Sequence, residues 1–136
     1  MSSHILITGG AGFIGSHTAD ALIAAGHSVR VLDSLHPQVH GPSGEFPAYL
    51  HPAVERIRGD ICDQDALRAA LDGVDVVYHM AAETGVGQSQ YEVARYFQTN
   101  VTGTAALWEA ILSTGTHIRR VILSSSRAVY GEGAYY

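Results

Sequence analysis

The chain has 136 residues, of which 46% are hydrophobic and 15% charged, a balance typical of one folded domain rather than a disordered segment. Its formal net charge of -5 and the lack of any run of Lys or Arg argue against a nucleic-acid partner. The single cysteine, Cys62, fits a reducing compartment, and no stretch is typical of a secretion signal or membrane span, so we expect a cytoplasmic protein with no membrane partner.

Short apolar runs alternate with segments of helical spacing along the chain. The runs that predict buried strands are residues 4–8, 28–32, 54–58, 74–79 and 121–123. Helices are predicted from Ile14 to Ala25, from Asp63 to Leu71 and from about Tyr91 to Leu112. A loop rich in His, Pro and Gly is predicted at residues 34–52. Strands that alternate with helices predict an α/β fold with a doubly wound parallel sheet.

A glycine-rich turn separates the first predicted strand from the first predicted helix. It reads Gly9-Gly10-Ala11-Gly12-Phe13-Ile14-Gly15 and contains the pattern Gly-x-Gly-x-x-Gly. At such a turn, missing side chains let backbone amides approach a pyrophosphate, and the helix N-terminus adds partial positive charge. A tight turn that only packs the helix closely is the alternative. We assign cofactor binding to Gly9, Gly12, Phe13, Ile14 and Gly15.

An acidic residue ends the second predicted strand. Asp33 lies eighteen residues after Gly15, near the ~20-residue offset at which a carboxylate receives the hydroxyls of the adenosine ribose. The carboxylate would repel a 2′-phosphate, and no Arg or Lys follows between Ser34 and Glu45, so NAD is the expected cofactor. Ser34 is grouped with Asp33 as a candidate contact. The alternative is that Asp33 only fixes its own turn.

Further motifs follow in a fixed order. They are Gly59-Asp60-Ile61, His79-Met80-Ala81-Ala82, Asn100-Val101-x-Gly103-Thr104 and Ser124-Ser125-Ser126-x-x-Val129-Tyr130-Gly131. With the glycine turn and Asp33, these motifs make the chain resemble, almost from end to end, the extended short-chain dehydrogenase/reductase family. Within that family the likeness is greatest to the NAD-dependent nucleotide-sugar epimerases, the group of the UDP-glucose and dTDP-sugar 4-epimerases.

The resemblance implies further contacts with the cofactor. They would be made by Asp60, Ile61, Met80, Ala81, Ala82, Thr99, Asn100 and Ser124. Asp60 and Ile61 would hold the adenine, residues 80–82 would line the ribose and pyrophosphate, and Thr99 or Asn100 would face the nicotinamide. The plain alternatives are a simple strand end at residues 80–82 and a buried Asn100 amide that ties helix to strand.

The resemblance also implies contacts with a nucleotide-sugar substrate, a UDP- or dTDP-hexose. Thr84, Gly85 and Val86 stand where the family begins to touch the sugar. Ser126 matches the active-site Ser or Thr and is the candidate catalytic residue, because a hydroxyl can both donate to and accept from the sugar hydroxyl that is oxidised. The alternative is that the hydroxyl of Ser126 satisfies backbone groups at the strand end.

The activity implied by the resemblance is 4-epimerisation, in which the sugar is transiently oxidised at C4 and hydride passes to NAD and back. In the family the base is the tyrosine of a Tyr-x-x-x-Lys motif, but this sequence has no Lys, and Tyr130, Tyr135 and Tyr136 are not assigned that role. We expect the motif and the sugar-nucleotide domain beyond residue 136. Residues 1–136 would then be the N-terminal NAD-binding Rossmann domain of a longer enzyme, inactive alone.

The resemblance also implies that the full-length enzyme is a homodimer, which would pair through the helix of Trp108 and a later helix that this chain lacks. This chain would then expose an apolar strip. Arg127 and Ala128 stand where the family's 4,6-dehydratases carry Asp-Glu, which disfavours a dehydratase against an epimerase or reductase. A non-catalytic dinucleotide-binding module is the alternative from another class. A metal site at His36, His40 and His51 is disfavoured by the Pro-rich loop and the lack of a cysteine pair, and no metal is expected.

Overall fold

Five parallel strands form the centre of the molecule. The structure is a computed structural model that describes residues 2–115 and 117–130. The strands are β1 (His4–Thr8), β2 (Ser28–Asp33), β3 (Glu55–Arg58), β4 (Val76–His79) and β5 (Arg120–Leu123), in the spatial order β3-β2-β1-β4-β5. Every predicted strand is therefore confirmed, with bounds that agree within two residues.

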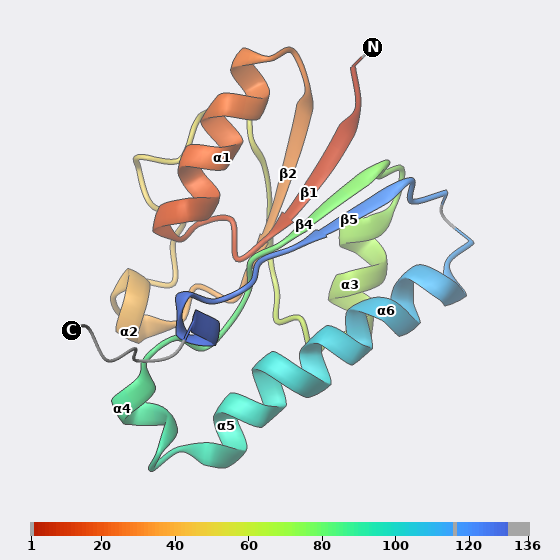
Figure 1. Cartoon of the computed structure of the whole chain (residues 1–136). Coiled ribbons are helices and arrows are strands. Elements are labelled where there is room, and N and C mark those ends of the chain that lie inside the picture. The colour runs from red at the N-terminus through yellow and green to blue at the C-terminus, as the bar shows by residue number, and fades with distance from the viewer. Residues whose placement is uncertain (1, 116, 131–136) are drawn as a thin grey trace, which may run out of the picture.

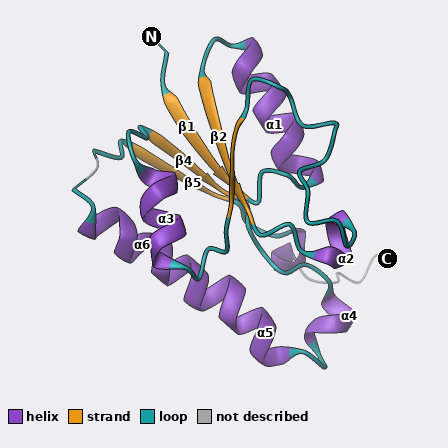
Figure 2. Cartoon of the chain, turned by 180° about the vertical axis from the view of Figure 1, so that it is seen from behind, coloured by secondary structure: helices purple, strands orange, loops and turns teal. Residues whose placement is uncertain are grey.

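Helices cover both faces of this sheet. α1 (Phe13–Ala24) lies on one face, while α3 (Gln64–Leu71) and α6 (Thr104–Ser113) lie on the other, as Figure 1 and the reverse view in Figure 2 show. Asp63 begins α3 by accepting hydrogen bonds from the amides of Asp65 and Ala66. The predicted doubly wound α/β fold is confirmed.

Two apolar cores flank the sheet because side chains of a strand point alternately to its two faces. Ile5 and Ile7 of β1 belong to the core beneath α1, whereas Leu6 between them belongs to the core beneath α3 and α6. The second core also includes Leu67 and Leu107, both almost fully buried. Burial on both faces explains why the strands read as continuous apolar runs in the sequence.

Two single-turn helices interrupt segments that periodicity does not resolve. α2 (Pro37–His40) lies within residues 34–52, which were predicted to be a loop, and α4 (Val86–Ser89) follows β4. Pro37 suits the first helical position because it has no amide hydrogen to leave unpaired, and the His36 side chain accepts from the amide of Gln38. Helices of four residues are too short to show a helical repeat.

The long predicted helix is confirmed as α5 (Val93–Phe97), a π-helical segment Gln98–Gly103 and α6, which form one continuous rod in Figure 1. Its core-facing residues include Leu107, whereas Trp108 and Leu112 are 46% and 81% exposed. Trp108 and Leu112 thus lie on the outer face of the helix. Among the described residues, no helix has the length and apolar character needed to cross a membrane.

Candidate functional site

The strand order reverses between β1 and β4, the place where open α/β sheets bind ligands at the carboxyl ends of their strands. The two strand ends are in close backbone contact here. A Cβ atom built on Gly9, directly after β1, would lie 2.7 Å from the Cα and amide nitrogen of Ala81, two residues after β4. The sequence-predicted glycine turn and residues 80–82 are therefore side by side.

The glycines of the turn have different physical roles. Gly9 has φ +68°, and a Cβ on Gly15 would lie 2.5 Å from the Cα of Gly10, so the fold itself requires both. Gly12 has an ordinary φ of -71°, and the nearest heavy atom to its added Cβ is the carbonyl oxygen of Gly9 at 3.4 Å. Apart from Gly12 itself and its two chain neighbours, none of the described residues has another heavy atom within 4 Å of that position. The structure therefore leaves open space beside Gly12.

That open space lies at the N-terminus of α1. Gly12 is the N-cap of the helix and has no side chain that could pair with its first amides, and the first turn carries no acidic residue. Phe13 and Ile14, which begin the helix, are 79% and 68% exposed. Unpaired amides and the positive end of the helix dipole suit an anionic group such as a diphosphate.

Asp33 lies beside the glycine turn, as the spacing predicts. Its Oδ2 accepts a hydrogen bond from the amide of Ala11 at 3.0 Å, and its Oδ1 accepts from the amide of Leu35 at 2.9 Å. The bond to Leu35 is the turn-fixing contact considered as an alternative, so the carboxylate both fixes its own turn and faces the glycine loop. Ser34 is exposed next to it.

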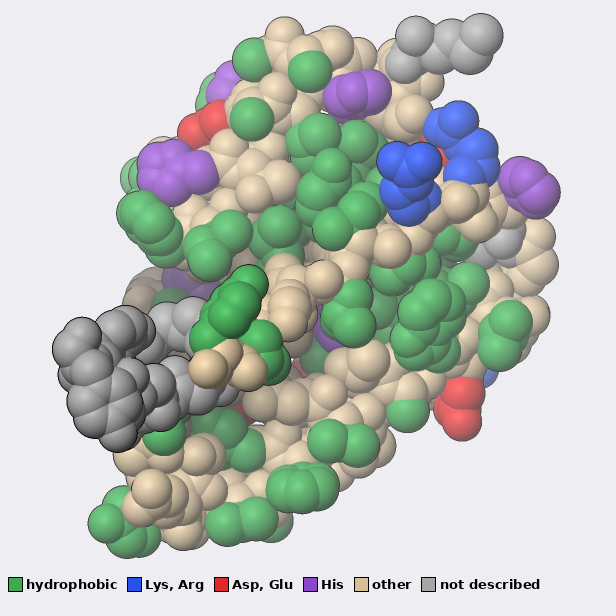
Figure 3. Space-filling view, viewed as in Figure 1, with side chains coloured by type: hydrophobic (Ala, Val, Ile, Leu, Met, Phe, Trp, Pro, Cys, Tyr) green, Lys and Arg blue, Asp and Glu red, His purple; other side chains and the backbone are tan. Residues whose placement is uncertain are grey.

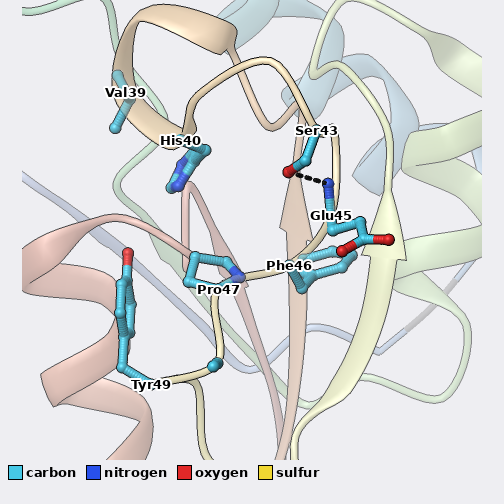
Figure 4. A pocket seen from close by; sticks show the side chains of 8 residues that line it. Val39, His40, Ser43, Glu45, Phe46, Pro47 and Tyr49 are labelled. Carbon is cyan, nitrogen blue, oxygen red and sulfur yellow. Dashed lines mark hydrogen bonds between the residues drawn. The ribbon is translucent and has the colours of Figure 1, made fainter.

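Two side chains from residues 34–52 contact the glycine turn and Asp33. The hydroxyl of Tyr49 donates to the carbonyl of Ala11 at 2.6 Å, and the Nε2 atom of His40 lies 3.6 Å from Oδ1 of Asp33. Burial, and then the negative charge of Asp33, raise the pKa of Tyr49, which keeps its hydroxyl protonated as a donor. Figure 4 shows both side chains beside Phe46 and Pro47, around a pocket of about 370 Å³.

The sequence did not predict that Tyr49 and His40 contact the glycine turn and Asp33. They belong to no spaced motif, and their contacts depend on how an irregular segment folds back over the turn. His40 was considered only as a metal ligand together with His36 and His51. In the part of the chain that the structure describes, no group of three or more His, Cys, Asp or Glu side chains could hold a metal ion.

Asn100 links the π-helical segment to the chain after β4. Its Oδ1 accepts from the amide of Glu83 at 2.8 Å, and its Nδ2 donates to the carbonyl of Glu83 at 3.1 Å. This is the helix-to-strand tie foreseen as the alternative, although Asn100 is exposed rather than buried. The next residues, 84–86, are also exposed, so the tie holds the candidate sugar-binding segment near the helix.

Asp60 and Ile61, the candidate adenine contacts, differ in accessibility. Asp60 is exposed, and its Oδ1 accepts from the amide of Cys62 at 2.8 Å. Ile61 is 4% exposed and packs against Gly103, so an adenine contact at this residue would have to use its backbone. Burial raises the pKa of Cys62, which favours the thiol over the nucleophilic thiolate.

The three serines follow β5. The amide of Ser124 donates to the carbonyl of His79 at 3.2 Å, which extends the pairing of β4 and β5, and Ser126 is exposed at the start of a short 3-10 turn. Tyr130 is 88% exposed. The side chains of Arg127 and Ala128, and all of residues 131–136 with Tyr135 and Tyr136, lie outside the described residues.

Comparisons with known proteins identify the family of the chain. Residues 5–135 match the NAD dependent epimerase/dehydratase family. The chain is 44% identical over 133 residues to a dTDP-L-rhamnose 4-epimerase of Burkholderia thailandensis, covering 96% of this chain and 36% of that protein. It is 42% identical over 135 residues to a UDP-glucose 4-epimerase of Streptomyces lividans, covering 97% and 38%.

A solved structure shows the same fold. The crystal structure of UDP-glucose 4-epimerase from Brucella ovis in complex with NAD superposes with a TM-score of 0.82 at 35% identity, over 98% of this chain and 39% of that one. The chain thus spans less than two fifths of the length of these relatives. Because the family match extends over nearly all its residues, the chain belongs to the NAD dependent epimerase/dehydratase family.

Proposed function

We propose that the chain binds NAD through the glycine turn and Asp33. The observation that carries this proposal is the open space beside Gly12, since no neighbouring atom accounts for a glycine there. The diphosphate would occupy that space against the amides of α1. The adenosine ribose would then lie toward Asp33, whose carboxylate oxygens keep lone pairs beyond those used by Ala11 and Leu35. We also propose contacts from the other candidate residues, namely Ser34, Asp60, Ile61, Met80, Ala81, Ala82, Thr99, Asn100 and Ser124.

The charge of Asp33 favours NAD over NADP. Its side chain is 9% exposed, so a 2′-phosphate placed against it would meet a poorly screened like charge. Among the described residues, His40 is the only histidine within ion-pair distance of this carboxylate. Two amide donors already hold the carboxylate in place, which keeps it ready for the ribose hydroxyls.

We further propose that the chain is the cofactor-binding part of a nucleotide-sugar 4-epimerase. Two of the similar proteins are a dTDP-L-rhamnose and a UDP-glucose 4-epimerase. Bound NAD would supply the hydride acceptor for a sugar oxidised at C4. The Ser126 hydroxyl would hold the sugar hydroxyl by a hydrogen bond, and residues 84–86, anchored through Asn100, would orient the hexose.

The catalytic Tyr-x-x-x-Lys and most sugar-nucleotide contacts would come from the part of the enzyme that corresponds to the unmatched length of the relatives. A dehydratase is less well supported, because Arg127 and Ala128 stand in place of the Asp-Glu pair that this reaction requires. A non-catalytic dinucleotide-binding module remains the alternative that the activity experiment below separates.

A homodimer is proposed for the full-length enzyme. The outer face of the α5 to α6 rod carries five large apolar side chains that are 46% to 81% exposed, namely Val93, Phe97, Val101, Trp108 and Leu112. Figure 3 shows hydrophobic side chains gathered over these helices, along the lower part of the molecule. Association of two such strips would remove this apolar surface from water.

The experiment uses the full natural polypeptide that carries this chain. Calorimetric titration with NAD and NADP is followed by incubation of the NAD-bound protein with UDP-glucose, UDP-galactose and dTDP-linked hexoses, and the products are separated by chromatography. We expect NAD binding and interconversion of one pair of 4-epimers without net reduction of NAD. Binding of NAD without turnover of any sugar nucleotide would favour the non-catalytic module, and a dehydrated product would contradict the epimerase.

Ser125 and Ser126 offer a matched pair of variants, because both are exposed neighbours after β5. Loss of a hydrogen bond to the reacting group predicts turnover at least about tenfold lower in Ser126→Ala. Ser125→Ala should keep the turnover of the wild type. Equal turnover in the two variants would remove Ser126 from its proposed role.

A further inference from the structure

A line of three polar side chains runs through the core beneath the glycine turn. Thr8 is the last residue of β1, His79 the last residue of β4, and Thr104 the first residue of α6. The hydroxyl of Thr8 lies 2.7 Å from Nδ1 of His79, and the hydroxyl of Thr104 lies 3.0 Å from its Nε2. Thr8 is fully buried and His79 is 4% exposed. One imidazole therefore connects two strands and the long helix.

The donors and acceptors along this line allow one consistent order. The hydroxyl of Thr104 donates its single hydrogen to the carbonyl of Asn100 at 2.8 Å, so toward His79 its oxygen must accept. The hydrogen of the imidazole is then on Nε2. That leaves Nδ1 as an acceptor for the hydroxyl hydrogen of Thr8. Burial lowers the pKa of His79, which agrees with a neutral ring.

The Thr8 end of the line fixes the backbone at the switch point of the sheet. Its oxygen accepts hydrogen bonds from the amides of Met80 at 3.2 Å and Ala81 at 3.3 Å. Ala81 is the residue whose backbone would collide with a side chain on Gly9. The Met80 amide also donates to the backbone carbonyl of Thr8 at 3.1 Å, so the Thr8 hydroxyl adds a second set of contacts that hold the end of β4 beside the glycine turn.

The Thr104 end of the line fixes the π-helical segment. Thr104 holds the carbonyl of Asn100, and the Asn100 side chain holds both backbone groups of Glu83. Wider π turns within helices are frequent at functional sites. This one contains Thr99 and Asn100, the two residues of which one was proposed to face the nicotinamide.

We infer that His79, as the neutral imidazole protonated on Nε2, is a positioning residue that sets the separation between the glycine turn and Asn100. The inference rests on the proposed NAD site, and His79 would act through Thr8 and Thr104 rather than by contact with the cofactor. An apolar side chain could fill the same core volume, but it could not donate at one end and accept at the other. A dinucleotide spans both halves of the site, whereas ADP needs only the glycine turn and Asp33.

The first test does not depend on cofactor binding. Long-range nitrogen–hydrogen NMR correlations of the full natural polypeptide at pH 7, without added cofactor, report which ring nitrogen of His79 carries hydrogen; the His79→Gln variant identifies the signal. We expect a protonated Nε2 and a bare Nδ1. A ring protonated on Nδ1, or on both nitrogens, would overturn the inference.

The second test compares NAD with ADP by calorimetry in His79→Leu, His79→Gln, Thr104→Val and Thr104→Ser. We expect about tenfold weaker NAD binding in His79→Leu and Thr104→Val, because one or two buried hydrogen bonds are lost. ADP binding should change by less than about threefold, because ADP would not reach the Asn100 end of the line. His79→Gln and Thr104→Ser, which keep a donor and an acceptor, should retain most of the NAD affinity. Thr104→Val keeps the imidazole, so it serves even if His79→Leu does not fold.

The outcomes separate the two proposals. Equal weakening of NAD and ADP, or unchanged NAD binding in both His79→Leu and Thr104→Val, would show that the line is only structural and would overturn the inference. A wild-type protein that binds neither NAD nor ADP would contradict the proposed function, and the positioning role with it. In that case the NMR result still shows which ring nitrogen of His79 carries the hydrogen.

Discussion

Substitution of Gly12 by alanine tests whether a bound ligand or the fold itself requires glycine at this position. The new methyl group would meet only the carbonyl oxygen of Gly9 at 3.4 Å, with an ordinary backbone φ. Alanine is a poorer N-cap than glycine by up to about 1 kcal/mol. Alanine also lowers the conformational entropy of the unfolded chain, which stabilises the folded state by about 0.4–1 kcal/mol. We therefore expect the free energy of unfolding of Gly12→Ala to stay within about 1 kcal/mol of the wild type.

Cofactor affinity should respond differently. A methyl group beside the first amides of α1 would keep a diphosphate from them, and each charge-assisted hydrogen bond lost costs about 1.5–3 kcal/mol, or about 10-fold to 100-fold in affinity. Gly9→Ala should instead destabilise the fold by about 2–5 kcal/mol. It adds the strain of a left-handed alanine to overlap with the backbone of Ala81 at 2.7 Å.

The assay is urea unfolding followed by calorimetric titration with NAD, on the full natural polypeptide. Gly26→Ala is the matched control, because Gly26 has φ +84° but no atom within 4 Å of its added Cβ, and it lies at the far end of α1. It should lose about 1–2 kcal/mol of stability and no NAD affinity. Wild-type NAD affinity in Gly12→Ala, or unfolding of that variant, would refute the reasoning.

Asp33→Ala should weaken NAD binding by about tenfold or more and reduce the ratio of NAD affinity to NADP affinity, as titrations with the two cofactors would show. An unchanged affinity ratio would contradict the proposed contact of Asp33 with the ribose. Because burial lowers the pKa of His79 from its usual 6.5, the free energy of unfolding should fall as the pH drops below that value toward the folded-state pKa, by at most about 1.4 kcal/mol per pH unit from this group. Urea unfolding at several pH values should show a shallower loss in His79→Gln, and identical slopes would refute the assignment. Leu112→Lys should weaken self-association of the full polypeptide in analytical ultracentrifugation, because Leu112 is 81% exposed on the apolar strip, and an unchanged dimer would exclude that strip as the interface.

Local periodicity and spacing were sufficient to predict the strands, the glycine turn and the place of Asp33. Each of these depends on residues close in sequence, or on the rule that carboxyl ends of parallel strands meet at one edge. The separation of Gly15 and Asp33 is set by one helix and one strand, so the spacing translates directly into proximity. The hydrogen bond from Ala11 to Asp33 is the physical result.

Other features depend on contacts that no local pattern encodes. Tyr49 reaches Ala11 because an irregular segment folds back over the glycine turn. The separation of 38 residues between them corresponds to no repeat or motif that could predict the contact. The core position of Ile61 follows from the close approach of the π-helical segment at Gly103. The polar line through His79 requires the relative placement of β1, β4 and α6, which only the tertiary structure supplies.

The proposed NAD site places the diphosphate at the start of α1. The most direct measurement is a nitrogen–hydrogen correlation spectrum of the full natural polypeptide, recorded as NAD is added. We expect the largest amide shifts at Gly12, Phe13, Ile14 and Gly15, and in Gly12→Ala we expect the shifts to require about 10-fold to 100-fold more NAD. Saturable NAD binding with these four amides unmoved would contradict this placement of the diphosphate.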